Sequence, residues 1–394
     1  MTGPLKQLKI LDFSTLLPGP YATMLLADMG ADVIRIESPT RADMLKETSP
    51  KFEKYSYAHY SINRNKRSLA IDLKNPQAKE VIVKLIADYD ILIEQFRPGV
   101  MKKFGLDYES LKIVNPKLIY CSITGYGQTG ELKNRAGHDI NYLALSGLAS
   151  YSGRKESGPS LSATQIADLA GGSHHAVMSI LAAEIARRST DLGQHLDISI
   201  RDTAFSLNTM FGASALASEV DPDLEDQILN GGSFYDYYKT SDGRYISVGS
   251  LEPKFAKLFF ETIARPQWLM RAANKEEIGA LKADIAEVFA LQDYQYWKNK
   301  FNKIDACIEP VLSINEVANH PMFESRKMIL EIKLANDHQI KQIAPAVKFS
   351  ENREDFFVGK KLGEDSETIL RSIGYSDARI DQLIKNGIIT LCEH

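Results

Sequence analysis

Three residues in the sequence have side chains suited to acid–base chemistry and stand where helices are expected to begin. Asp168 lies in QIADLAGG, His138 in GHDINY and Glu252 in VGSLEPKF. The helix dipole stabilises a carboxylate near a helix N-terminus, and histidine suits proton transfer because its ordinary pKa lies near neutral pH. Each residue also has a structural interpretation: Asp168 as a helix cap, Glu252 as the N-terminal acid of the helix PKFAKLFFE, and His138 as a hydrogen-bonded structural group. The residues alone leave both interpretations open.

A glycine-rich stretch, Gly125-Tyr-Gly-Gln-Thr-Gly130, follows the expected buried strand LIYCSI and spells G-x-G-x-x-G. In a dinucleotide-binding fold such glycines join the first strand to a helix that follows at once. Here the polar segment ELKNRAG intervenes, and the next helix is expected only near His138 and Asp139. We therefore predict no dinucleotide site. Two uses of Gly125, Gly127 and Gly130 stay open, a mobile cover over a site and a plain surface turn.

The composition is that of a globular protein and narrows the classes of partner. The chain has 394 residues, 44% of them hydrophobic and 25% charged, which is long enough for two domains. The net charge of −4 and the pI near 6.1 argue against a general nucleic-acid binder. No apolar run reaches about 18 residues and no signal-peptide pattern is seen, so we expect a cytoplasmic protein without membrane association. The spacing of Cys121, Cys307 and Cys392 predicts neither disulfides nor a metal site.

The first half of the chain alternates short aliphatic runs with amphipathic segments, which predicts βα units and a parallel sheet. The expected strands are LKILDFS, DVIRIE, ILIEQF, LIYCSI and HLDISI. A long helix through ADLAGGSHHAVMSILAAEIARRS is apolar nearly all round in its centre and is expected to be buried. From about Asn230, an aromatic-rich strand pair around Asp242-Gly243 opens a second, smaller domain. Near the C-terminus, MILEIKLANDHQIKQIAPAVKFS is expected to form strands and the tail two helices, which return to the first domain.

Seven stretches, read in order, resemble the family III CoA-transferase family, the CaiB/BaiF group. They are LLADMGADVIRIESP, NRNKRSLAIDLK, ILIEQFRPGVMKKFGL, ITGYGQTG, AGHDINYLALSGL, ADLAGG and GQHLDISIRD. The likeness covers about the whole chain. It implies an α/β fold in which a doubly wound, Rossmann-like parallel-sheet domain consists of residues 1–200 and 331–394. Residues 201–229 would be a linker and 230–330 a smaller α+β domain, and two chains would form an interlocked homodimer.

The resemblance also implies acyl-CoA or coenzyme A as the bound partner, with no cofactor beyond the CoA of the substrate and no nucleic-acid or membrane partner. The CoA phosphates need local positive charge even on an acidic protein. The expected CoA-binding residues are Arg97, Arg64, Lys66, Arg67, Gly125 and Gly127, whereas Lys102 and Lys103 are expected to be solvated. The glycine stretch then resembles a loop that lies over the active site and moves during turnover.

Family membership leaves the reaction open, because the family contains both CoA transferases and α-methylacyl-CoA racemases. GHDINY resembles the racemase branch, in which His138 and Asp168 would move the α-proton of a 2-methylacyl-CoA thioester, a step of fatty acid metabolism. Backbone N–H groups near Asp139 would hold the enolate. Tyr142 would hydrogen-bond to Asp168, and Glu252 would pair with the histidine across the subunit interface.

Two other functions remain as alternatives. In a transferase, Asp168 would attack the acyl thioester and carry CoA as an aspartyl-CoA thioester to a carboxylic acid. A catalytically silent CoA-binding protein is the other alternative, against which the complete acid–base set argues. Thr164 and Ser38 depart from residues common in the family, which puts the contacts beside Asp168 and one CoA phosphate contact in doubt.

Overall fold

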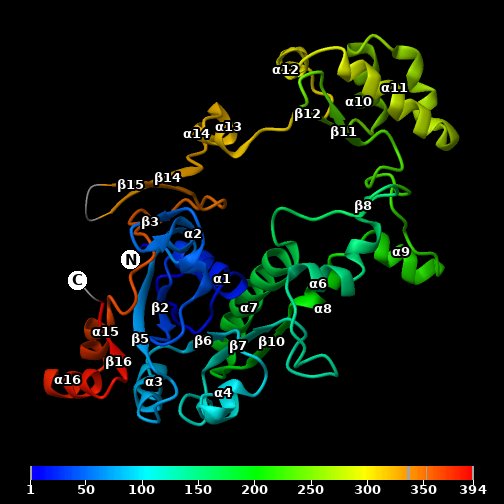
Figure 1. Cartoon of the computed structure of the whole chain (residues 1–394). Coiled ribbons are helices and arrows are strands. Elements are labelled where there is room, and N and C mark those ends of the chain that lie inside the picture. Colours follow the sequence, from blue (N-terminus) through cyan, green and yellow to red (C-terminus); the bar gives the residue numbers. More distant parts are fainter. Residues whose placement is uncertain (1, 335–337, 352, 393–394) are drawn as a thin grey trace. The chain divides into compact units, whose positions relative to one another are not determined.

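The computed structural model describes residues 2–334, 338–351 and 353–392, which form two compact units (Figure 1). The first unit comprises residues 1–146, 163–207 and 325–394, and the second comprises 147–162 and 208–324. The expected division differs, because it gave 147–162 to the first domain and treated 201–229 as a linker. The structure gives 147–162 a clear reason to join the second unit, since Arg154 there forms ion pairs with Glu225 and Asp236.

A seven-stranded sheet is the centre of the first unit, in the order β10-β7-β6-β1-β2-β5-β16. Its strands are β1 (Lys9–Asp12), β2 (Asp32–Glu37), β5 (Lys66–Ile71), β6 (Ile91–Glu94), β7 (Ile119–Thr124), β10 (His195–Ser199) and β16 (Ile389–Thr390). All pairs are parallel except β16, which runs antiparallel to β5 beside it in Figure 1. The six parallel strands follow the doubly wound order 3-2-1-4-5-6, in which the direction of winding reverses between β1 and β6. The predicted α/β class with a parallel sheet is confirmed.

Helices cover the faces of this sheet. They are α1 (Pro18–Asp28), α2 (Tyr57–Ile62), α3 (Ala78–Ile86), α4 (Val100–Lys103), α5 (Tyr108–Leu111), α6 (Asp139–Leu145), α7 (His174–Thr190), α8 (Ile200–Ser206), α15 (Ser366–Ser372) and α16 (Asp377–Lys385), with the 3-10 helix η1 (Met44–Glu47) and the π-helix η3 (Ala167–Ser173). Ile82 of α3, Ile369 of α15 and Leu383 of α16 join Leu11 and Ile34 of the strands in one apolar core. The right-handed crossover of α1 places it on the other face, where it packs against α7.

Helix α7 is less buried than its sequence predicts. Ala176 and Ile180 are fully buried, but Met178 and Ile185 are 55% and 68% exposed. The expectation that this helix is buried all round is therefore wrong for the single chain.

Three further sheets have two strands each, and two of them belong to the first unit and one to the second. The first unit also holds the antiparallel pairs β3 (Lys51–Phe52) with β4 (Tyr55–Ser56), and β14 (Ile329–Lys333) with β15 (Gln339–Ile343). The second unit holds β8 (Gly153–Arg154) paired with β9 (Gly158–Pro159). The strands expected in the segment that starts at Met328 are thus a hairpin, and the two expected tail helices are α15 and α16.

The second unit has its own aromatic core around a three-stranded antiparallel sheet. Its remaining elements are η2 (Leu148–Tyr151), α9 (Phe211–Ser218), β11 (Asp236–Lys239), β12 (Tyr245–Val248), α10 (Pro253–Thr262), η4 (Pro266–Leu269), η5 (Arg271–Ala273), η6 (Lys275–Glu277), α11 (Ile278–Ala290), α12 (Tyr294–Phe301), β13 (Ile308–Pro310), α13 (Ile314–Ala318) and α14 (Pro321–Ser325), whose last residue belongs to the first unit. The predicted strand pair around Asp242-Gly243 is confirmed, since β11 and β12 flank that turn.

Candidate active site

Asp168 lies in the first turn of η3, a π-helical segment between the preceding loop and α7. Short π-helices are rare and frequently mark functional sites. The small residues of the sequence ADLAGGS let η3 pack closely: a Cβ on Gly171 would lie 3.1 Å from Thr203 Oγ1, and one on Gly172 would lie 3.2 Å from Ile200 Cγ1. Both neighbours belong to α8. The tight packing fixes the backbone that presents Asp168, which is partly buried.

Asp139 is the immediate neighbour that shapes the chemistry of Asp168. The Asp168 backbone N–H donates to Asp139 Oδ1 at 3.0 Å. Burial, and secondly the charge of Asp139, raise the pKa of Asp168 to about 7. A carboxyl group with such a pKa can both take up and release a proton near neutral pH. Unusual pKa values of this kind are common at functional sites.

His138 caps the N-terminus of α6 and has an exposed side chain. Its backbone N–H donates to Asn141 Oδ1 at 3.0 Å, which fixes the start of the helix. Helix α6 packs against η3, and the next residue, Asp139, bonds to Asp168. The structure thus brings the His138–Asp139 corner and Asp168 into one neighbourhood of the first unit.

Tyr142 is close to this carboxylate but is not its hydrogen-bond partner. The Tyr142 hydroxyl donates to the carbonyl oxygen of Gly137 at 2.7 Å, and burial followed by the charge of Asp168 raises its pKa to about 12. The predicted bond from Tyr142 to Asp168 is therefore not formed, because the single hydroxyl proton is used locally. The ring packs edge-on against Tyr126, with centroids 5.4 Å apart.

The glycine stretch follows β7, the fifth parallel strand along the chain, and α6 begins only at Asp139. A Cβ on Gly125 would lie 2.4 Å from Tyr142 Oη, so glycine is needed for this close approach. Gly127 and Gly130 have φ angles of +82° and +84°, a region that favours glycine. At its centre the loop is held by the Gln128 N–H, which donates to both Asp197 carboxylate oxygens at 3.1 and 3.0 Å. The geometry is unlike a dinucleotide fingerprint, and movement of this loop stays a prediction.

The carboxyl ends of β1 and β6 meet where the winding of the sheet reverses, which is where ligands bind in open α/β sheets. The N-terminus of α1 offers little to an anion there: Pro18 and Pro20 have no N–H, and the Gly19 N–H donates to Gln95 Oε1 at 3.0 Å. Arg97, just beyond β6, is exposed, and no carboxylate of the described residues pairs with it. A cation at this edge is therefore available to a ligand.

The three other basic residues predicted to contact CoA, which are Arg64, Lys66 and Arg67, have partners inside the protein. Arg64 and Lys66 are 2% and 1% exposed. Arg64 bonds bidentately to Asp28 and donates to the Ile343 carbonyl oxygen at 3.0 Å, so it ties β15 to α1. Lys66 Nζ lies 3.4 Å from Asp12 Oδ2. A contact from either cation to CoA would require it to leave these partners, and this role stays a prediction.

Arg67 is the most accessible of the three. It bonds to both oxygens of Asp32 at 2.8 and 2.7 Å and to the Tyr89 hydroxyl. Its side chain is 26% exposed. Its assignment to CoA likewise stays a prediction.

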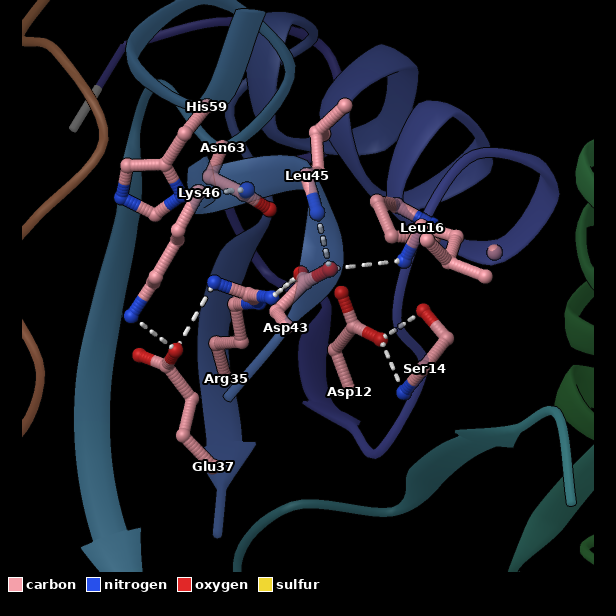
Figure 2. Close-up of polar contacts among 12 residues, drawn as sticks. Asp12, Ser14, Leu16, Arg35, Glu37, Asp43, Leu45, Lys46, His59 and Asn63 are labelled. Carbon is pink, nitrogen blue, oxygen red and sulfur yellow. Dashed lines mark hydrogen bonds and ion pairs between the residues drawn. The ribbon is translucent and has the colours of Figure 1, made fainter. Parts of the chain in front are cut away.

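A buried cluster of charges at the carboxyl end of β1 and β2 was not foreseen from the sequence (Figure 2). Arg35 pairs with Glu37 at 2.9 Å and with Asp43, and Lys46 pairs with Glu37 at 2.6 Å. With Asp12 and Lys66, the cluster contains three cations and three carboxylates, so it leaves no net charge for a phosphate. The one sequence signal was the pair of charges at Arg35 and Glu37 within the aliphatic strand DVIRIE.

This cluster holds the loop that follows β1. Asp43 Oδ1 accepts the N–H groups of Leu16 at 3.3 Å and Leu45 at 3.0 Å (Figure 2). Leu16 has a φ of +63°, which costs conformational energy in any residue with a side chain. Ser14 also donates its backbone N–H to Asp12 at 2.9 Å. The buried carboxylates therefore set the path of the chain at the sheet edge described above.

Glu252 lies in the second unit, at the N-cap of α10, and its carbonyl accepts the N–H groups of Phe255 and Ala256. This is the structural role that the sequence alone suggested. Its predicted pairing with His138 across a subunit interface stays a prediction. Among the described residues there is no group of His, Cys, Asp and Glu arranged to hold a metal ion, and no helix of this part of the chain is long and apolar enough to span a bilayer.

Comparison with known proteins places the chain among enzymes of CoA chemistry. Residues 5–365 match the family model of CoA-transferase family III. The human alpha-methylacyl-CoA racemase is 33% identical over 98% of this chain and 97% of its own length. The human succinyl-CoA:glutarate CoA-transferase is 29% identical, covering 98% and 90%. The crystal structure of a CAIB/BAIF family protein from Brucella suis superposes with a TM-score of 0.82 at 28% identity, covering 95% of this chain and all of that one. The chain therefore belongs to CoA-transferase family III, and it is an enzyme of a family that includes both racemases and CoA transferases.

Proposed function

We propose that this enzyme epimerises 2-methylacyl-CoA thioesters by removing and returning the α-proton. The observation that carries the proposal is the Asp168 carboxyl, whose pKa of about 7 suits proton transfer. A nucleophilic carboxylate acts in its ionised form, which would be only about half of the population at pH 7. The 33% identity to a racemase along the whole chain supports the same choice.

In the proposed mechanism Asp168 and His138 act on opposite faces of the substrate. One of them takes the α-proton, the electron pair of the C–H bond passes into the enolate of the thioester, and the other delivers a proton to the opposite face. Backbone N–H groups near Asp139 would stabilise the enolate oxygen. Asp139 tunes Asp168 through the contact described above. The reaction needs no cofactor beyond the CoA that the substrate carries.

The test is NMR of one pure epimer of 2-methyldecanoyl-CoA with the enzyme in D₂O and no acceptor acid. We expect deuterium at C2 together with epimerisation, and loss of epimerisation in His138→Ala. The matched control is His320→Ala, a half-buried histidine of the second unit that the mechanism does not use. Retention of full epimerisation in His138→Ala would remove His138 from the mechanism.

The second candidate function is CoA transfer through an aspartyl-CoA thioester on Asp168. The 29% identity to a CoA transferase supports it. If C2 stays protonated in D₂O, adding a carboxylic acid to the same sample decides the matter: movement of CoA to the acid would make Asp168 a nucleophile, and His138 a structural residue.

We further propose that Arg97 binds a CoA phosphate. Arg97 is exposed, and no carboxylate of the described residues pairs with it. It follows β6, next to the point between β1 and β6 where the winding of the sheet reverses. Gly125 and Gly127 would lie over the bound thioester. The expected signature is a raised KM for acyl-CoA in Arg97→Ala, with the fold unchanged.

The homodimer is also a proposal. Its support is the exposed apolar surface of the first unit, to which Ile140 (54% exposed), Met178, Ile185 and Phe205 (53%) contribute. Isolated monomers seldom expose so many large apolar side chains on neighbouring helices. Sedimentation velocity would test it, and a clean monomer at micromolar concentration would exclude both the dimer and a role for Glu252 across its interface.

A further inference from the structure

A cavity of about 710 Å³ lies within the first unit, and neither Asp168 nor His138 lines it. The apolar walls are formed by Leu25 of α1, Met29 directly after α1, Val177 of α7 and Leu330 of β14, and Val347 lies beyond β15. This volume is in the range of small-molecule sites, which are mostly apolar with a few placed polar groups. The walls therefore suit a ligand with an aliphatic body.

The charged residues that line the cavity are mostly cations without counter-charges. Arg326 and Lys327 have no carboxylate partner within the described part of the chain. Lys348 Nζ donates to the carbonyl oxygens of Pro345 at 2.8 Å and Lys327 at 3.4 Å. Three cations thus gather on the wall, and no carboxylate of residues 2–334, 338–351 or 353–392 pairs with them.

The acidic group of the cavity is already neutralised. Asp28 accepts bonds from Arg64 and from Asn65 Nδ2 at 2.8 Å. The fourth lining cation, Arg353, is 4% exposed; it donates to the carbonyl oxygens of Ala27 and Asp355 and lies 3.3 Å from Asp355 Oδ1. The excess positive charge therefore stays with Arg326, Lys327 and Lys348.

Mutual repulsion among these cations favours an anionic ligand. Partial burial and the charge of Arg326 lower the pKa of Lys348, as expected for an ammonium group that faces a like charge. A bound anion would relieve this repulsion and gain charge-assisted hydrogen bonds. Because the other walls are apolar, a small inorganic anion would leave most of the cavity unfilled.

We propose that this cavity binds an amphipathic monoanion, a medium-chain carboxylate whose aliphatic chain packs between α1, α7 and β14 while its carboxylate meets Arg326 and Lys348. The inference does not depend on the reaction at Asp168. It concerns a second site for an apolar acid in its free form, distinct from a thioester, which has no carboxylate.

The test is calorimetric titration of sodium decanoate into the full chain at neutral pH, with octanoate, acetate and 1-decanol as comparison ligands. We expect saturable binding of one decanoate per chain. Octanoate, two CH₂ groups shorter, should bind about fifteenfold more weakly. Acetate lacks the chain and decanol lacks the charge, so both should bind at least about tenfold more weakly than decanoate.

Variants locate the site. Lys348→Ala and Arg326→Ala, both exposed positions, should each weaken decanoate binding about tenfold, and Val347→Glu should abolish it by placing a negative charge in the wall. Lys385→Ala, an exposed lysine at the end of α16, is the matched control and should change nothing. His138→Ala should also bind decanoate normally, which separates this site from the proposed catalytic one.

Two results would overturn the proposal. One is the absence of saturable binding up to about 1 mM decanoate, which includes the case in which a second copy of the chain fills the cavity. The other is binding that Lys348→Ala, Arg326→Ala and Val347→Glu leave unchanged, since the fatty acid would then occupy another surface.

Discussion

Replacing Asp139 by asparagine should separate the two causes of the raised pKa of Asp168, which are burial and the charge of Asp139. The pKa of Asp168 rises from an ordinary 3.8 to about 7, and burial contributes more to this rise than the charge of Asp139 does. Asp139→Asn removes the charge but keeps an oxygen that can accept the Asp168 N–H. Less than half of the rise should therefore disappear, and we expect the pKa of Asp168 to fall by about 1.

The assay is the pH dependence of kcat/KM for each pure epimer of 2-methyldecanoyl-CoA, which reports ionisations of the free enzyme. In the direction in which Asp168 accepts the proton, activity should fall below its pKa; in the other direction, activity should fall above it. Both limbs should move to lower pH by about 1 pH unit in Asp139→Asn. A direct effect on binding would instead change KM without moving either limb.

The control is Asp381→Asn, an exposed carboxylate of α16 that should leave both profiles in place. Limbs that stay fixed in Asp139→Asn would refute the idea that Asp139 acts through its charge. Limbs that shift to higher pH would refute the sign of the electrostatic argument, because removal of a neighbouring negative charge can only favour the ionised carboxylate.

Three further changes have defined outcomes. Because the folded-state pKa of Asp168 is raised, this carboxyl group lowers the stability of the protein as pH rises from about 4 through 7. In urea unfolding at pH 8, Asp168→Asn should therefore have a free energy of unfolding about 1–2 kcal/mol higher than that of the wild type, after allowance for the partial exposure of the group. At pH 4 the variant should show no gain. Gly125→Ala forces a methyl group to 2.4 Å from Tyr142 Oη and should lower stability by about 1–3 kcal/mol in thermal melts, whereas Gly279→Ala, with open space around it in α11, should not destabilise the protein. Arg97→Ala should raise the KM for acyl-CoA about tenfold while its melting temperature stays that of the wild type, and an unchanged KM would remove Arg97 from the binding site.

Local sequence patterns were enough to predict most of the parallel sheet. Strand β2 coincides with the expected DVIRIE, since its aliphatic run lies between Gly30 and Pro39. Strand β5 was not expected, because it begins with Lys66 and Arg67 and reads as a loop. These cations are tolerated in the sheet since Asp12 and Asp32, on strands far away in sequence, neutralise them. That pairing is a property of the assembled fold, which no local pattern contains.

The same limit applies to the candidate site. The sequence suggested that Asp168 and His138 carry the chemistry, and the structure adds the burial of Asp168 and, secondly, the charge of Asp139, which together raise the pKa of Asp168. The expected partner, Tyr142, bonds instead to Gly137, only five residues before it. Helical spacing could not predict which acceptor that hydroxyl would choose.

Buried charges at the carboxyl end of β1 and β2 give a basic residue of the predicted CoA-binding motif a partner inside the protein. Lys66 belongs to the basic segment NRNKRS, yet its ammonium lies 3.4 Å from Asp12 Oδ2. Figure 2 shows Asp12 beside the paired Arg35 and Asp43 of the same cluster. Buried ion pairs are weak evidence for stability, because desolvation offsets much of their attraction. Their effect here is geometric: Asp43 holds Leu16 in a strained conformation at the edge of the sheet where a ligand would bind. The basic residues of this fold therefore differ in availability, since Arg97 is exposed whereas the buried cations belong to the cluster that shapes the loop after β1.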